Sequence, residues 1–99
     1  MEVQFRTHDL ERCFESYREA TRRWGPEVAR RYIQRINLLL AARDFNELYH
    51  IRALRLHALT GGRTGQFAMT LQGRWRLIVV PNETGDVVRV EEVTNHYGD

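Results

Sequence analysis

The chain has 99 residues, 42% of them hydrophobic and 28% charged, which is the size and composition of one globular domain covering residues 1–99. No apolar run approaches the length that a membrane-spanning helix needs, and the polar residues Glu2, Gln4 and Arg6 argue against a secretory signal. The single cysteine, Cys13, excludes an internal disulfide and a cysteine zinc site and favours a reducing compartment. We therefore expect a single-domain cytoplasmic protein.

Charge is unevenly distributed along the chain, although the formal net charge is only +2. All 15 basic residues are arginine, and the 13 acidic residues lie either up to Glu47 or from Glu83 onwards. The stretch between them, residues 48–82, is free of acids and contains His50, Arg52, Arg55, His57, Arg63, Arg74 and Arg76. The planar guanidinium fork suits phosphate groups and stacks on bases, so this stretch favours RNA or DNA as a partner. A codon bias would also replace lysine by arginine, but it does not explain the missing acids.

The first half of the chain is predicted to be helical. Thr7 can cap a helix that runs to about Trp24, because the apolar residues recur at the three-and-four spacing of one helical face. Gly25 and Pro26 suit the end of this helix and the start of a second one, which is expected from about Pro26 to Arg43. A turn this short predicts that the two helices pack against each other antiparallel.

The second half is predicted to form strands, because the hydrophobic period changes from 3.6 toward 2 after about Leu54. The expected strands are residues 66–71, 74–80 and 86 to about 96, with a hairpin turn at residues 72–73. In the last strand Val88 and Val90 are two residues apart and should point to one side, whereas Val93 should point to the other side. This pattern indicates a bulge or a strand that is buried on both sides. Helices followed by strands along the chain predict an α+β domain in which two N-terminal antiparallel helices pack on one face of a small antiparallel sheet. The other face of the sheet is then available as a site.

Three kinds of site find no support in the sequence. The histidines have no metal-ligand spacing, and Cys13 falls on the predicted buried face of the first helix, where a thiol behaves as a small hydrophobe. Residues 61–65 are glycine-rich but lack the spacing and the lysine of a phosphate loop. We expect a hairpin loop there, with Arg63 reaching outward, and we expect neither a metal nor a cofactor.

A set of histidines and arginines remains, which the strand model can bring to one sheet face and its edges. The set consists of His57, Arg63, Arg74, Arg76 and His96. Imidazole serves as base or acid near neutral pH, and guanidinium groups hold phosphate oxygens, so these residue types fit cleavage of a phosphodiester. The alternative for a histidine on a strand is a hydrogen-bonded structural role.

Three segments carry a resemblance to a known family. They are residues 56–69 with the run L-H-x-L-x-G, residues 73–77 with the run G-x-W-R, and residues 90–97 with a histidine near the C-terminus. In this order they resemble the plasmid-maintenance killer toxins, the HigB branch of the RelE/ParE superfamily, over nearly the whole chain. The resemblance implies a RelE-like fold and a type II toxin that cleaves mRNA on the ribosome.

The resemblance also implies roles for individual residues. His57 matches the histidine of the first run and His96 the histidine near the C-terminus, both implicated in RNA cleavage, while Arg76 matches the arginine after the strand tryptophan. The residues expected to hold RNA phosphate are Arg63, Arg74 and Tyr97. The sequence departs from the family pattern at Thr60, where many relatives have lysine, and at residues 94–95, where many have Asp-Tyr.

The partners implied by the resemblance are the ribosome with its mRNA and a cognate antitoxin, expected to be a helix-turn-helix protein of the HigA type. No membrane and no cofactor are implied. Because members of one fold differ in their targets, a ParE-like toxin that inhibits DNA gyrase without nuclease activity is the alternative. A degenerate toxin that retains only antitoxin binding is a third possibility.

Overall fold

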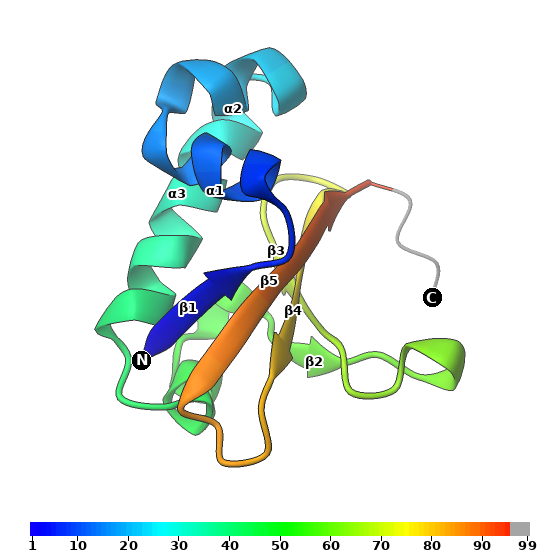
Figure 1. The fold of residues 1–99 in the computed structure, drawn as a ribbon. Coiled ribbons are helices and arrows are strands. Elements are labelled where there is room, and N and C mark those ends of the chain that lie inside the picture. The colour runs from blue at the N-terminus through cyan, green and yellow to red at the C-terminus, as the bar shows by residue number, and fades with distance from the viewer. Residues whose placement is uncertain (96–99) are drawn as a thin grey trace.

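The structure of the protein is a computed structural model, in which residues 1–95 are described. Its elements are β1 (Glu2–Phe5), α1 (His8–Glu15), α2 (Tyr17–Trp24), α3 (Pro26–Ala41), η1 (Phe45–His50), η2 (Arg52–Leu54), β2 (His57–Ala58), η3 (Gly61–Arg63), β3 (Phe67–Thr70), β4 (Arg76–Pro81) and β5 (Val87–Thr94), where η marks a 3-10 helix. The strands form one sheet in the order β1-β5-β4-β3-β2. Figure 1 shows the α-helices gathered beside and behind the sheet, so the predicted α+β class is confirmed.

The core lies between α3 and the inner face of the sheet. Ile36 and Leu39 of α3 belong to the same buried cluster as Leu77 and Val79 of β4. Leu77 and Val79 face the core as the sequence predicts for β4, and Arg76 lies on the opposite, outer face together with Ile78, which is fully buried. The inner face thus holds the domain together, and the outer face carries polar residues around the buried Ala68 and Ile78.

The first predicted helix is in fact two helices, which meet at Ser16. The amide of Ser16 donates to the carbonyl oxygen of Arg12 at 2.9 Å and ends α1, while its hydroxyl accepts from the amide of Glu19 at 3.2 Å and caps α2. The prediction of one helix from Thr7 to Trp24 was therefore wrong, and three α-helices rather than two lie between β1 and the remaining strands. The second predicted helix is confirmed as α3, which ends two residues early.

One edge of the sheet corrects the prediction of an antiparallel sheet. β1 pairs in parallel with β5, with Glu2 opposite Val87 and Phe5 opposite Val90. The other neighbouring strands in the described part of the chain pair antiparallel, as predicted. The sheet is therefore mixed, and its first and last strands in the sequence lie side by side.

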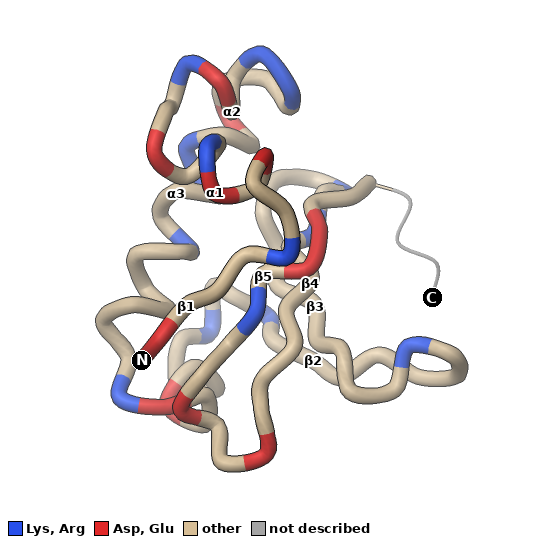
Figure 2. The backbone as a smooth tube through the Cα atoms, in the orientation of Figure 1, with Lys and Arg blue, Asp and Glu red and all other residues tan. Residues whose placement is uncertain are grey.

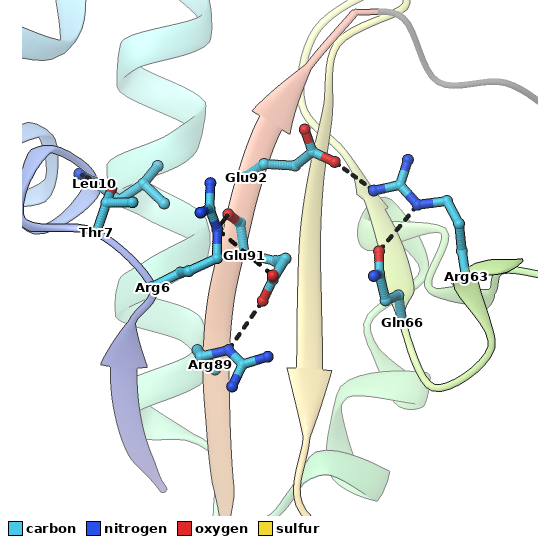
Figure 3. Close-up of polar contacts among 8 residues, drawn as sticks. All are labelled: Arg6, Thr7, Leu10, Arg63, Gln66, Arg89, Glu91 and Glu92. Atoms are coloured by element: carbon cyan, nitrogen blue, oxygen red, sulfur yellow. Dashed lines mark hydrogen bonds and ion pairs between the residues drawn. The ribbon is translucent and has the colours of Figure 1, made fainter.

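Strand β5 contains the bulge that the valine pattern indicated. Glu92 lies opposite Ile78, whereas Val90 lies opposite the next residue of β4, so Glu91 is the extra residue. Val90 packs in the core before the bulge and Val93 packs against the core after it, which means that the inward parity changes at this point. As a result, two consecutive glutamates lie on the outer side of the sheet, as Figure 3 shows.

Candidate functional site

The outer face of the sheet is organised in rows, because directly opposed residues of neighbouring strands point to the same side. One row contains His57, Ala68, Ile78 and Glu92, and the adjacent row contains Thr70, Arg76 and Thr94. Two of the predicted site residues, His57 and Arg76, therefore share this face. The strand spacing places their Cα atoms roughly 12 Å apart, near enough for both side chains to reach one nucleotide linkage.

His57 is exposed at the start of β2, and the backbone before it fixes the orientation of its ring. Its Nδ1 lies 2.9 Å from the carbonyl oxygen of Arg55, a residue with the left-handed φ of 49°. A carbonyl can only accept a hydrogen bond, so Nδ1 carries the proton in this contact. In the neutral imidazole Nε2 is then the basic nitrogen, which is the state that a proton acceptor needs.

Arg76 is anchored by the turn between β3 and β4. Its Nη1 donates to the carbonyl oxygens of Gly73 at 2.7 Å and of Trp75 at 2.9 Å. The turn requires a positive φ of 57° at Gly73, which suits glycine and explains the predicted hairpin at residues 72–73. Arg74 is exposed in the same turn. The backbone thus orients the guanidinium group of Arg76 on the outer face.

Arg63 does not reach outward, as the sequence predicts, but folds back over the sheet. Its Nε donates to Oε1 of Gln66 at 3.0 Å, and its Nη2 forms an ion pair with the carboxylate of Glu92 (Figure 3). Glu92 follows 29 residues later in the chain and is brought here by the pairing of β5 with β4. Residues 48–82 contain no acid, but the fold places the carboxylate of Glu92 against Arg63 of this stretch.

The bulge in β5 adds a group of charged residues that sequence reasoning missed. Glu91 contacts Arg89 of β5 and Arg6 of the segment between β1 and α1. Figure 2 shows acidic positions in red and basic positions in blue close together around β5. Both arginines lie outside the acid-free stretch, so charge distribution along the sequence did not single them out. The change of valine parity was the one signal that pointed to this place.

His96 and Tyr97 lie outside the described residues, and their roles stay predictions. The last residue of β5 is Thr94, which lies opposite Arg76 on β4.

Residues 1–95 lack the features of two other kinds of site. This part of the chain has no group of three or more His, Cys, Asp or Glu side chains that could hold a metal ion. It also has no helix long and apolar enough to cross a membrane. Cys13 is buried in α1, as predicted, and burial raises the pKa of its thiol.

Two solved structures share the arrangement of helices and strands described above. The YoeB/ParE toxin from Agrobacterium tumefaciens matches with a TM-score of 0.59 and 15% sequence identity over 98% of this chain and 100% of that chain. The chain has the fold of this toxin. The YoeB-YefM complex from Staphylococcus aureus matches with a TM-score of 0.54 and 17% identity over 98% of both chains.

The sequence itself matches no protein-family model and no curated protein. The two structural matches confirm the toxin fold that the resemblance implies, while the assignment to the HigB branch stays a prediction. Within this YoeB/ParE-type fold, His57 and Arg76 lie on the outer face of the sheet, with Glu91 and Glu92 beside them.

Proposed function

We propose that the protein is the toxin of a type II toxin-antitoxin system and that it cleaves mRNA on the ribosome. The observation that carries the proposal is the outer face of the sheet, where His57 is oriented by a backbone carbonyl and Arg76 by two others. The toxin fold and the resemblance of residues 56–69 and 73–77 to the killer toxins support the same conclusion.

In the proposed reaction, the 2′-oxygen of a ribose attacks the adjacent phosphorus. Nε2 of His57 accepts the proton of the 2′-hydroxyl, and the guanidinium group of Arg76 stabilises the negative charge that builds up on the phosphorane. The bond from phosphorus to the 5′-oxygen then breaks, and that oxygen receives a proton from an acid, a role that we assign to His96. The products are a 2′,3′-cyclic phosphate and a free 5′-hydroxyl.

Substrate binding is assigned to the remaining predicted residues. Arg74 is exposed in the turn before Arg76. In this proposal Arg74 and Tyr97 contact phosphate directly. Arg63 is held by Glu92 in the free protein, so it exchanges this carboxylate for a phosphate oxygen when RNA binds.

A cognate antitoxin silences the toxin in this proposal. One of the matching structures is a YoeB-YefM complex, which shows that a chain of this fold has been solved together with a second protein. We propose an antitoxin of the helix-turn-helix HigA type for the present chain, on the ground of the sequence resemblance.

The proposal is tested in a reconstituted translation reaction in which mRNA ends are mapped by primer extension. We expect the parent protein to produce new ends in ribosome-bound mRNA and the Arg76→Gln variant to cleave about 100-fold more slowly. The matched control is Arg30→Gln, because Arg30 is an exposed arginine on α3. Intact mRNA with the parent protein, or equal rates with Arg76→Gln, would contradict the mechanism.

A gyrase supercoiling assay on the same preparations distinguishes mRNA cleavage from the alternative function, inhibition of DNA gyrase. It is included because one matching structure is described as a YoeB/ParE toxin. Inhibited supercoiling together with intact mRNA identifies a gyrase-inhibiting toxin, whereas cleaved mRNA with normal supercoiling supports the nuclease.

A further inference from the structure

Glu91 joins two arginines on the outer face. Its carboxylate accepts from Nε of Arg89 at 2.9 Å and lies 3.5 Å from Nε of Arg6, which also donates to the backbone carbonyl of Glu91 at 2.9 Å (Figure 3). The side chain of Glu91 is only 17% exposed, whereas those of Arg6 and Arg89 are 52% and 48% exposed. One carboxylate therefore contacts two guanidinium groups. The group of Arg6, Arg89 and Glu91 carries a net charge of one positive unit.

The atoms used in these contacts matter for what the arginines can still bind. Both Arg6 and Arg89 are held through Nε, and among residues 1–95 no hydrogen bond of their Nη groups is seen. In contrast, Arg30 on α3 donates from both Nη atoms to Glu27, at 2.9 and 2.7 Å, so its fork is closed by a carboxylate. The Nη fork is the part of arginine that binds two phosphate oxygens at once. Glu91 thus fixes two arginines and leaves their forks available.

The position of the pair relates it to the proposed active site. Arg89 lies opposite Val80 of β4, four residues along the strand from Arg76 on the same face. The strand geometry places the Cα atoms of Arg76 and Arg89 roughly 14 Å apart, a distance that a few nucleotides span. The adjacent acid Glu92 is engaged by Arg63, and the carboxylate of Glu2 accepts from the side-chain amide of Gln4 at 2.9 Å.

Arg6 also borders a groove between α1, α2 and β5. The groove has a volume of about 260 Å³ and is lined by Arg6, Arg23 and Trp24 and by two acids, Asp9 and Glu92, the second of which is paired with Arg63. Arg23 is paired with Asp9 at 2.8 Å, so Arg6 supplies the arginine of this groove that is held only through Nε. A base attached to a phosphate on Arg6 therefore has space and an aromatic side chain beside it.

We propose that Arg6 and Arg89 bind a backbone phosphate of the same RNA strand that is cleaved at His57 and Arg76, with Glu91 as the residue that positions them. This inference rests on the proposed function and extends it from the reacting linkage to a neighbouring one. The ligand is a phosphodiester of single-stranded RNA, which passes from the β4 side of the outer face across β5 toward α1.

The test is a binding titration with a short fluorescein-labelled 2′-O-methyl RNA, followed by fluorescence anisotropy. The methyl group blocks the attacking oxygen, so binding is measured without cleavage. We expect the double variant Arg6→Gln/Arg89→Gln to bind about tenfold more weakly than the parent protein, with a salt dependence that is shallower by roughly 0.7 to 1.4 in the log-log slope. The matched control is Arg30→Gln, which removes an arginine whose fork is already closed. We expect it to bind like the parent protein.

The cleavage assay on the same preparations separates this inference from the proposed function. If the parent protein cleaves mRNA and the double variant binds RNA like the parent, or if the parent binds no free RNA, the phosphate site is wrong and the nuclease stands. If the double variant loses affinity but the parent cleaves nothing, the phosphate site is supported and the nuclease is wrong. Absence of both binding and cleavage in the parent overturns both.

Discussion

Arg63 and Glu92 are 29 residues apart in the sequence and form an ion pair across the outer face of the sheet. The pair connects the loop between β2 and β3 to β5, a strand that is not a neighbour of either. The two side chains are 36% and 37% exposed, so solvent screens the pair and its contribution to the free energy of unfolding is small. We expect its main effect to be on the loop, which it ties to β5.

The Glu92→Gln variant tests this role. We expect faster amide hydrogen exchange in residues 61–65, because the loop loses its charged contact to β5, and a change in the free energy of unfolding of less than about 1 kcal/mol. Glu83→Gln is the control, since Glu83 is exposed in the loop between β4 and β5. Unchanged exchange in residues 61–65 would show that the loop is held by other contacts.

The His57→Ala variant tests the role of the imidazole as base. We expect the rate of mRNA cleavage to fall by roughly 10²–10⁴, the usual contribution of one proton-transfer group, while RNA binding stays close to that of the parent protein. His50→Ala is the control, because His50 lies in the same acid-free stretch but on η1. A His57→Ala protein that cleaves at the parent rate would remove His57 from the mechanism.

Arg35 is the buried cation of α3, only 4% exposed, and its Nε donates to the carbonyl oxygen of Thr70 at the end of β3 at 3.1 Å. Burial, followed by the nearby Arg31, lowers the pKa of its guanidinium group. We expect Arg35→Ala to lower the free energy of unfolding by about 2 kcal/mol, because the buried stem and the contact to Thr70 are both lost. Urea denaturation measures this change. Arg30→Ala, which alters an exposed side chain, should change the value by less than about 1 kcal/mol.

Tyr32 is fully buried, and its hydroxyl donates to the carbonyl oxygen of Leu10 at 2.7 Å. We expect Tyr32→Phe to lower the free energy of unfolding by about 1–2 kcal/mol at neutral pH, because the Leu10 carbonyl loses its partner.

The same residue predicts a pH dependence. Burial raises the pKa of Tyr32 in the folded protein well above that of an unfolded tyrosine, which is about 10. Its contribution to stability is therefore complete below about pH 10 and declines above it, as the unfolded chain loses the proton. Urea denaturation at several alkaline pH values should show a smaller loss of stability for Tyr32→Phe than for the parent protein. Equal losses would mean that Tyr32 ionises as readily in the folded state.

Much of the fold could be predicted because burial imposes periodicity. Leu77 and Val79 alternate with Arg76 along β4, and this pattern places the arginine on the outer face without knowledge of the neighbouring strands. The break at Ser16 could not be seen, because a serine within an amphipathic run is also compatible with an unbroken helix. The partner of β1 could not be predicted either, since four alternating residues carry no information on which strand they join.

The site could be predicted in part for a related reason. Arg76 belongs to a strand whose side is set by alternation, so its face was accessible from the sequence. His57 lies on the two-residue strand β2, where both residues are exposed and no strand was predicted, so its face follows only from the pairing with β3. The contact between Arg63 and Glu92 depends on the register of β5 against β4, and this register changes at Glu91. The valine parity indicated that a bulge exists but not which residue it adds, so the two glutamates and the arginines around them were missed.

Strand β5 lies between β1 and β4, although it follows both in the sequence. A polypeptide that emerges from the ribosome N-terminus first can form α1 to α3 early, but its sheet lacks a middle strand until residues 87–94 have been synthesised. Before that point the inner face has no closed core and Arg63 has no Glu92 to hold it. The surface that combines β4 with β5 is therefore assembled only when the last strand has been made.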